Sequence, residues 1–439
     1  MRVERELSFA SDLLHARDFA RLSPADHGLA TELVMGVLRW QSLLDSEILA
    51  NSGQPFHKLD LEVLVALRLG LCQLRRLSRI PPRAAIHQSV ELVKRAHKRS
   101  AAGFVNAILR KLAAAGDQPK IASAHRKGIT IGLVAHETAH PPWMVERWAR
   151  AYGVEAAQLI CQYDQSVPGA AIRLRSPEAE AQLHEEGIEL APGALLTCAR
   201  RARQGDITHT HTYKSGLCTI QDEASQLVAS LVGKGSRILD CCAAPGGKTL
   251  AIADNNPGAS IMAVELHPHR ARLLQRLLRK PNFPGTSPGS IHVLTADACS
   301  LPFSDSFDRV LVDAPCSGTG TLARNPEIKW RLRPEDLSDL QSRQFAILRS
   351  AMQRVTVGGR LIYSTCALEK EENEDVVERA LAEDRSFRVI ECSAELDRLK
   401  AESKLTWPGS PSVVNGSYLR TLPGVHPCDG FFVAILERL

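Results

Sequence analysis

The sequence lacks any apolar run near the ~18 residues that a membrane-spanning helix requires. Its first residues, Met1-Arg-Val-Glu-Arg-Glu6, also lack the basic-then-apolar layout of a secretory signal. We therefore expect a cytoplasmic protein with no membrane partner.

No two of the 11 cysteines are spaced as C-x-x-C, and their number is odd. An odd number in so long a chain argues against a disulfide framework, and the missing C-x-x-C argues against a zinc ribbon. We predict no metal site and expect most cysteines to be small buried hydrophobic residues. No internal repeat or extended low-complexity segment is present either.

Positive charge is distributed unevenly along the 439 residues, a length that suggests roughly two to four domains. Residues 1–140 hold 20 of the 54 Lys and Arg but only 13 of the 49 Asp and Glu. The net charge of +5 therefore comes entirely from this N-terminal third. Such an asymmetry points to a polyanionic partner for that third.

Residues 1–130 read as an all-α region of about six helices, because apolar residues recur at helical spacing and no strand-like alternation occurs. Basic residues cluster on these helices at Arg75, Arg76, Arg79, Arg83, Lys94, Arg95, Lys98, Arg99, Arg110 and Lys111. Solvated helix faces would explain them. We favour RNA backbone binding, since nothing acidic offsets them.

Residues 131–225 read as a small α/β connector, with a helix opening at His140-Pro-Pro-Trp143 and a strand at Ala170–Arg175. From residue 226 to 439, strands alternate with helices, which predicts a largely parallel sheet. The candidate strands are Arg237–Asp240, Ser260–Glu265, Ile291–Thr295, Arg309–Asp313, Arg360–Ser364 and Phe431–Leu436. The expected helices are one that starts at Pro334 and carries Leu337 to Val355 on one face, and Glu369–Leu381; Pro281–Gly289 is expected to be a loop.

The loop Cys241–Lys248 follows the first of these strands and precedes a helix, which brings backbone N–H groups close to a ligand. A P-loop would need glycine where Cys242 stands, and Gly246-Gly247 does not supply G-x-G-x-x-G. S-adenosylmethionine remains, because it needs a close backbone without a phosphate cradle. Glu265, Asp297 and Asp313 follow successive strands, where acids can bind ribose and other polar groups, although each alone could also be a helix cap.

Cys316 and Cys366 follow two of the strands, so both thiols are expected at the carboxyl edge of the sheet. A thiolate that adds to carbon 6 of cytosine or uracil makes carbon 5 nucleophilic enough to take a sulfonium methyl group. The carbon-5 proton and the thiol must then leave, and an acid near the N3 edge would assist. A lone cysteine on a strand is usually a core residue, but two at strand ends favour this chemistry. A zinc-dependent base deaminase would need Cys where Thr319 stands.

The motif Asp313-Ala-Pro-Cys-Ser-Gly-Thr-Gly320, followed by Arg324-Asn-Pro-Glu-Ile-Lys-Trp330, resembles the RNA cytosine-C5 methyltransferases of the NOL1/NOP2/Sun family. Gln221–Ser225, Cys242–Thr249, Ser364-Thr-Cys366 and Asp429–Ala434 match as well. Ala102–Lys111 resembles the NusB-like RNA-binding domain, and this pairing is typical of the B-type bacterial 16S ribosomal RNA methyltransferases. The resemblance implies a Rossmann-like, class I, S-adenosylmethionine-dependent α/β domain (226–439), an all-α NusB-like domain (1–130) and the connector (131–225).

The resemblance also implies the roles of the two thiols: Cys366 is the nucleophile, and Cys316 assists release of the methylated RNA. Chemistry alone leaves this order open, because DNA cytosine methyltransferases use the Pro-Cys thiol as nucleophile. We take Asp313 as the third catalytic candidate. The implied cofactor contacts are Cys242, Ala243, Ala244, Pro245, Gly246, Gly247, Lys248, Glu265, Asp297 and Asp313.

The sequence therefore predicts a monomeric enzyme that methylates cytosine C5 in 16S ribosomal RNA. The same chemistry on transfer RNA would use identical motifs, and only the NusB-like domain favours the ribosomal substrate. A non-catalytic RNA-binding or assembly factor is a further alternative, against which the intact thiol pair argues. Compared with that family, the chain is expected to begin several residues late at Met1.

Overall fold

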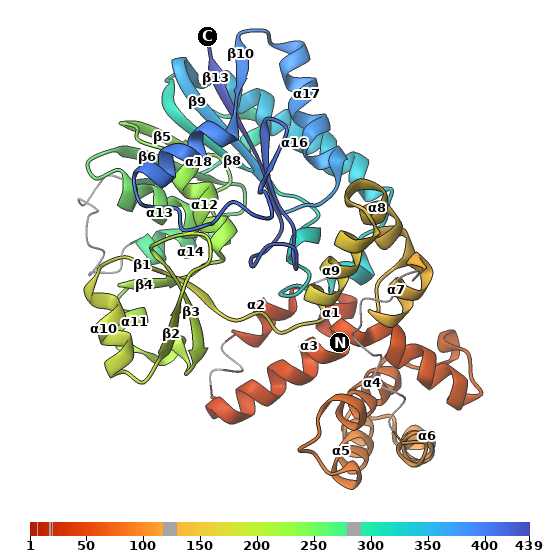
Figure 1. Cartoon of the computed structure of the whole chain (residues 1–439). Coiled ribbons are helices and arrows are strands. Elements are labelled where there is room, and N and C mark those ends of the chain that lie inside the picture. The colour runs from red at the N-terminus through yellow and green to blue at the C-terminus, as the bar shows by residue number, and fades with distance from the viewer. Residues whose placement is uncertain (7, 17–18, 20, 117–129, 279–290) are drawn as a thin grey trace. The chain divides into compact units, whose positions relative to one another are not determined.

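The computed structural model describes residues 1–439 except 7, 17–18, 20, 117–129 and 279–290 (Figure 1). It contains two compact units. The first, which we call the helical unit, comprises residues 1–167 and 322–332; the second, the sheet unit, comprises residues 168–321 and 333–439. The loop expected at 281–289 lies outside the described residues, and the domain boundaries near 130 and 225 stay predictions.

All regular elements that the structure describes in the helical unit are helices, so the all-α prediction for the N-terminal region is confirmed. The longest helix, α3, begins where the Ser23 side chain accepts a hydrogen bond from the Asp26 N–H, and it ends at Gly53, whose φ is 62°. The helices are α1 (Arg2–Arg5), α2 (Ala10–Leu14), α3 (Pro24–Ser52), α4 (Leu61–Arg76), α5 (Pro82–Arg95), α6 (Ala102–Ala114), α7 (Ile131–Glu137), α8 (Pro142–Tyr152), α9 (Val154–Asp164) and α15 (Ile328–Arg331).

The sheet unit begins with a small antiparallel sheet of strand order β2-β3-β1-β4. Its strands are β1 (Ala171–Leu174), β2 (Glu189–Pro192), β3 (Ala199–Gln204) and β4 (Cys218–Ile220), with α10 (Glu178–Glu185) and α11 (His211–Lys214) beside them. Ion pairs connect this sheet to α13 (Gly247–Asn255): Arg173 and Arg175 reach the carboxylate of Asp254 at 2.6 and 2.5 Å. The small sheet is thereby fixed to the helix that follows the glycine loop.

The large sheet has the strand order β11-β12-β13-β9-β8-β5-β6-β7, and β10 pairs with β13. Strands β9, β8, β5, β6 and β7 are parallel, whereas β13 is antiparallel to β9. All six predicted strands are present. The strands are β5 (Arg237–Asp240), β6 (Ser260–Glu265), β7 (Ile291–Thr295), β8 (Phe307–Asp313), β9 (Val355–Thr365), β10 (Phe387–Ile390), β11 (Val414–Asn415), β12 (Tyr418–Thr421) and β13 (Phe431–Arg438).

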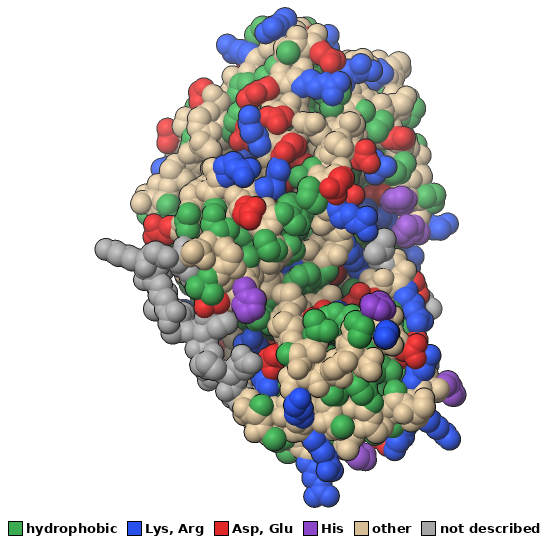
Figure 2. Space-filling view, turned by 90° about the vertical axis from the view of Figure 1, so that its right-hand side faces the viewer, with side chains coloured by type: hydrophobic (Ala, Val, Ile, Leu, Met, Phe, Trp, Pro, Cys, Tyr) green, Lys and Arg blue, Asp and Glu red, His purple; other side chains and the backbone are tan. Residues whose placement is uncertain are grey.

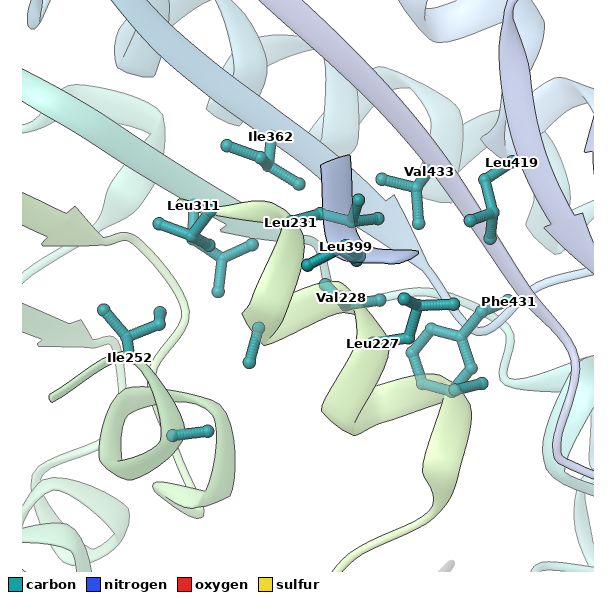
Figure 3. Packing of buried hydrophobic residues seen from close by; sticks show 14 of the residues in the cluster. Leu227, Val228, Leu231, Ile252, Leu311, Ile362, Leu399, Leu419, Phe431 and Val433 are labelled. Atoms are coloured by element: carbon teal, nitrogen blue, oxygen red, sulfur yellow. The ribbon is translucent and has the colours of Figure 1, made fainter. Parts of the chain in front are cut away.

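Helices cover both faces of the large sheet. Alternate side chains of each strand point to opposite faces, and apolar side chains on both faces are buried by packing against helices. On one face, α12 (Glu223–Leu231), α13 and α18 (Cys392–Ala401) pack against residues such as Leu311, Ile362 and Val433 (Figure 3). On the other, α16 (Asp336–Met352) and α17 (Glu374–Glu383) pack against Val310 and Tyr363. The sheet is therefore a buried middle layer. The carboxyl ends of its parallel strands lie at one edge, as in other open α/β sheets.

Two predicted helix boundaries were wrong. Val355 was expected on the apolar face of the helix after Pro334, but α16 ends at Met352 and Val355 opens β9, where it pairs with Phe307 of β8. The helix expected from Glu369 begins only at Glu374. The five residues before it take a different course, with consequences for the site.

Candidate active site

The two thiols that the sequence singled out lie together at the carboxyl ends of β8 and β9. The parallel register places Asp313 beside Ser364, so the chain leaves both strands at the same level. The Sγ atoms of Cys316 and Cys366 are 3.3 Å apart, and both residues are partly buried. The hydrogen bond to Cys366, together with burial and the repulsion of its charge, raises the pKa of the Cys316 thiol well above its usual range.

Asp313 connects this thiol pair to the glycine loop. Its carboxylate accepts a hydrogen bond from the Ser364 hydroxyl at 2.9 Å and from the Lys248 ammonium at 2.8 Å. Burial alone would lower the pKa of Lys248, but the charge of Asp313 and the hydrogen bond to it outweigh burial and raise the pKa. Lys248 is thus held as a cation, and a thiolate at Cys366 also contributes to its raised pKa.

The glycine loop at residues 242–248 turns tightly between β5 and α13. The Ala243 N–H donates to the Val264 carbonyl of β6 at 2.8 Å, and the peptide between Ala244 and Pro245 is cis. Gly246 has a φ of 114°, and a Cβ there would lie 2.6 Å from the Leu274 side chain of α14 (Pro268–Leu278). Only glycine fits this turn, because its φ is positive and a side chain would meet α14.

Two buried polar atoms beside this loop have no hydrogen-bond partner among the described residues. Asp240 accepts a bond from the Thr249 hydroxyl at 2.7 Å through Oδ2, but its Oδ1 has none, and burial raises the pKa of Asp240 to about 6. Gln221 has an unpartnered Oε1, and its amide lies about 3.5 Å from the position of a Cβ on Gly247. Such atoms are suited to a polar ligand in the loop.

The remaining predicted acids have local partners. Glu265, at the end of β6, is buried and accepts a hydrogen bond from the His267 N–H at 2.9 Å. Asp297 is exposed and caps the short turn at 298–300 through the Cys299 N–H at 2.9 Å. Within the described part of the chain, no hydrogen bond or ion pair joins Asp297 to Lys248 or to the thiols.

Sequence reasoning missed a set of polar residues that surround the thiols. Glu369, Glu372 and Asn373 follow β9 and are 3, 0 and 0% exposed, and Gln344 of α16 is equally buried. The acidic run that begins at Glu369 was expected in a helix, Glu369–Leu381. Its one available signal was its position directly after a strand end that carries a thiol.

Residues 324–330, which carry part of the family pattern, belong to the helical unit and not to the thiol site. Lys329 is 1% exposed, and its ammonium donates to the carbonyl oxygens of Arg39 and Ala139 at 2.9 and 3.0 Å. Burial lowers the pKa of Lys329 to about 7, against the opposing charge of Asp164. The Trp330 indole donates to the Leu38 carbonyl at 2.6 Å.

The expectation that no acid offsets the basic clusters was wrong in part. Arg75 pairs with Glu47 at 2.9 Å, Lys94 with Glu91 at 2.7 Å and Lys98 with Asp60 at 2.9 Å. Among the residues that the structure describes, no ion pair is found for six exposed residues of the clusters: Arg79, Arg83, Arg95, Arg99, Arg110 and Lys111. Figure 2 shows Lys and Arg side chains protruding at its lower end, at the level of α5 and α6 in Figure 1.

Neither a membrane segment nor a metal cluster is found in the described ranges. None of the helices there combines the length and the apolar character needed to span a bilayer. The same residues contain no group of three or more His, Cys, Asp or Glu side chains arranged to hold a metal ion.

The parallel sheet, the glycine loop after its first strand and the strand-end acids define a Rossmann-like methyltransferase fold, joined to a NusB-like helical region. A family model described as 16S rRNA methyltransferase RsmB/F matches residues 231–437, and the NusB family matches residues 3–114. The chain belongs to this family of ribosomal RNA small subunit methyltransferases, as the resemblance predicted.

Two relatives and one solved structure illustrate matches over nearly the whole chain. A probable ribosomal RNA small subunit methyltransferase B of Bacillus subtilis is 36% identical over 95% of this chain and 92% of its own length. A ribosomal RNA small subunit methyltransferase B of Pseudomonas syringae pv. tomato is 30% identical over 94% and 90%. The crystal structure of PH0851 has a TM-score of 0.78 at 22% identity, covers 96% of this chain and 92% of its own, and shares the fold.

Proposed function

We propose that this protein transfers the methyl group of S-adenosylmethionine to carbon 5 of a cytosine in 16S ribosomal RNA through a covalent adduct with Cys366. The 3.3 Å contact between the Cys316 and Cys366 sulfurs, beside the Lys248–Asp313 pair, is the observation that carries this proposal. A single nucleophile would need one thiol. Two in contact suit a reaction in which one adds and the other assists elimination.

The residues of the glycine loop fit the cofactor, because the orphaned Asp240 Oδ1 and Gln221 Oε1 are available to its polar groups. Residues 242–248 would hold it together with Glu265, Asp297 and Asp313. When bound, the cofactor supplies an electrophilic sulfonium methyl group. Its positive charge and that of Lys248 would favour an anionic sulfur on Cys366.

The thiolate of Cys366 adds to carbon 6 of the flipped-out base, which costs a few kcal/mol to unstack, and electrons move to carbon 5. We assign to Asp313 the contact with the N3 edge of the base. After carbon 5 has gained the methyl group, Cys316 accepts the carbon-5 proton, the bond between carbon 6 and sulfur breaks, and Cys366 leaves. The hydrogen bond to Cys366 is the first cause of the raised pKa of Cys316, and adduct formation would remove that cause.

The experiment measures methyl transfer from tritiated S-adenosylmethionine to 16S ribosomal RNA and, separately, to transfer RNA. Both RNAs are isolated from a strain in which the gene for this protein is deleted. Wild-type protein should label the RNA, bisulfite sequencing should map a 5-methylcytosine, and Cys366→Ala should label none. Labelling of transfer RNA instead would overturn the ribosomal substrate. No labelling of either RNA by wild-type protein would favour the assembly-factor alternative.

The second part of the experiment tests the release step. Cys316→Ser should accumulate protein covalently attached to RNA, seen as a shifted band on a denaturing gel. Turnover retained in Cys366→Ala would overturn the assignment of the nucleophile, and a missing adduct in Cys316→Ser would overturn the release role.

A further inference from the structure

In the acid-rich segment from Glu369 to Asn373, directly after the Cys366 strand, the side chains of Glu369, Glu372 and Asn373 are buried. Desolvating a carboxylate is unfavourable unless donors compensate it. Burial raises the pKa of Glu372 to about 7, and the charge of Glu369 adds to this. The hydrogen bonds of Glu372 and Asn373 connect this segment to residues directly beside the two thiols.

Glu372 holds the Cys316 loop. One oxygen, Oε2, accepts the backbone N–H of Ser317 at 2.8 Å and the Gln344 amide at 2.8 Å. The same amide nitrogen of Gln344 donates to the Pro315 carbonyl at 3.0 Å. The peptide groups before and after Cys316 are thus bound to one carboxylate–amide pair.

Asn373 holds the Cys366 loop in a similar way. Its Oδ1 accepts the Thr365 hydroxyl at 2.5 Å, and its Nδ2 donates to the Ala367 carbonyl at 2.9 Å. The Thr365 hydroxyl in turn accepts the Ala367 N–H at 3.2 Å. Residues on both sides of Cys366 are therefore bound to Asn373 and to each other.

We propose that Glu372 and Asn373 are positioning residues that act on different thiols, Glu372 on Cys316 and Asn373 on Cys366. Loss of one set of bonds then impairs one step of the reaction: release for Glu372, and adduct formation for Asn373. This inference rests on the proposed function.

The arrangement offers isosteric variants. Both bonds to Glu372 use Oε2, whereas Oε1 has no partner in the described structure. Glu372→Gln can therefore keep both bonds through its carbonyl oxygen, and Glu372→Leu cannot. Thr365→Val and Gln344→Met remove one polar group each at nearly constant volume. Lys370→Ala is the matched control, because its side chain lies in the same segment but is exposed.

The experiment follows adduct formation and RNA release by each variant in a single turnover, with circular dichroism as a check on folding. Glu372→Leu and Gln344→Met should slow release at least tenfold and accumulate adduct, as Cys316→Ser does. Asn373→Leu and Thr365→Val should slow adduct formation at least tenfold without accumulation. Glu372→Gln and Lys370→Ala should resemble the wild type.

Three results would overturn the inference: both sets of variants impair both steps equally, Glu372→Gln fails as Glu372→Leu does, or neither set changes either step. Should a leucine variant not fold, Gln344→Met and Thr365→Val carry the same comparison. Adduct in Cys316→Ser but not in Glu372→Leu or Gln344→Met rejects the positioning role alone, whereas no adduct in Cys316→Ser rejects the release chemistry as well.

Discussion

Gly430 donates its backbone N–H to the Gly320 carbonyl at 2.8 Å, and a Cβ on Gly320 would lie only 2.3 Å from the Gly430 carbonyl oxygen. The Gly320 N–H donates in turn to the Cys366 carbonyl at 2.8 Å. The close approach of Gly320 to Gly430, which directly precedes β13, therefore holds the backbone carbonyl of the candidate nucleophile Cys366.

We expect Gly320→Ala to separate these backbones. The added methyl group would meet backbone atoms of Gly430, which cannot move aside as the end of a flexible side chain would. Overpacking of this kind costs about 1–3 kcal/mol. A displaced nucleophile costs on the order of 100-fold in rate. Methyl transfer and urea denaturation measure the two effects. Gly28→Ala is the control, because a Cβ there meets nothing within 4 Å, and it should leave methyl transfer unchanged. A wild-type rate of methyl transfer in Gly320→Ala would contradict the prediction.

Removal of Cys366 should lower the pKa of Cys316. The hydrogen bond and the charge of Cys366 both raise that pKa, so Cys366→Ala removes two causes and leaves burial and the charge of Glu372. Because iodoacetamide reacts with the thiolate, it should alkylate Cys316 faster in the variant than in the wild type at pH 8. Mass spectrometry measures the ratio, with the partly exposed Cys299 as the internal reference. Equal alkylation of Cys316 in both proteins would show that the sulfurs do not interact.

Lys329→Met should destabilise the helical unit. It deprives the Arg39 and Ala139 carbonyls of their donor and removes the cation that offsets buried Asp164. Leaving a buried acceptor without its donor costs about 1–3 kcal/mol. Hydrogen exchange of α7–α9 in the full chain measures the loss, with the exposed Lys111→Met as control. Unchanged protection would mean that the ammonium contributes nothing to the packing of α15.

The unpaired basic residues should contribute most to RNA affinity. Arg83, Arg95 and Arg110 are exposed without ion pairs in the described structure, so replacing all three by alanine removes up to three phosphate contacts. For single-stranded RNA, this would flatten the slope of log affinity against log salt by up to about 2. Fluorescence anisotropy across a salt series measures the slope. Lys94→Ala with Lys98→Ala, whose ammonium groups already pair with Glu91 and Asp60, should change it less. A steeper slope in the triple variant would contradict the prediction.

The sequence by itself determined six strands of the large sheet, because alternation of strand and helix and the apolar runs are local signals. It also indicated that Cys316 and Cys366 would share one edge, since the carboxyl ends of parallel strands meet there. The end of α16 was not readable in this way, because Val355 is a strand residue only through its partner Phe307.

Only the tertiary structure decided where the polar support of the site lies. The burial of Glu372 depends on donors from Ser317 and Gln344, which are distant in sequence, and no periodicity predicts them. The same holds for Lys329, which follows the thiol loop in the chain but is buried in the helical unit among carbonyls of Arg39 and Ala139. A charged side chain is exposed by default, and only partners brought from elsewhere in the chain can offset its desolvation.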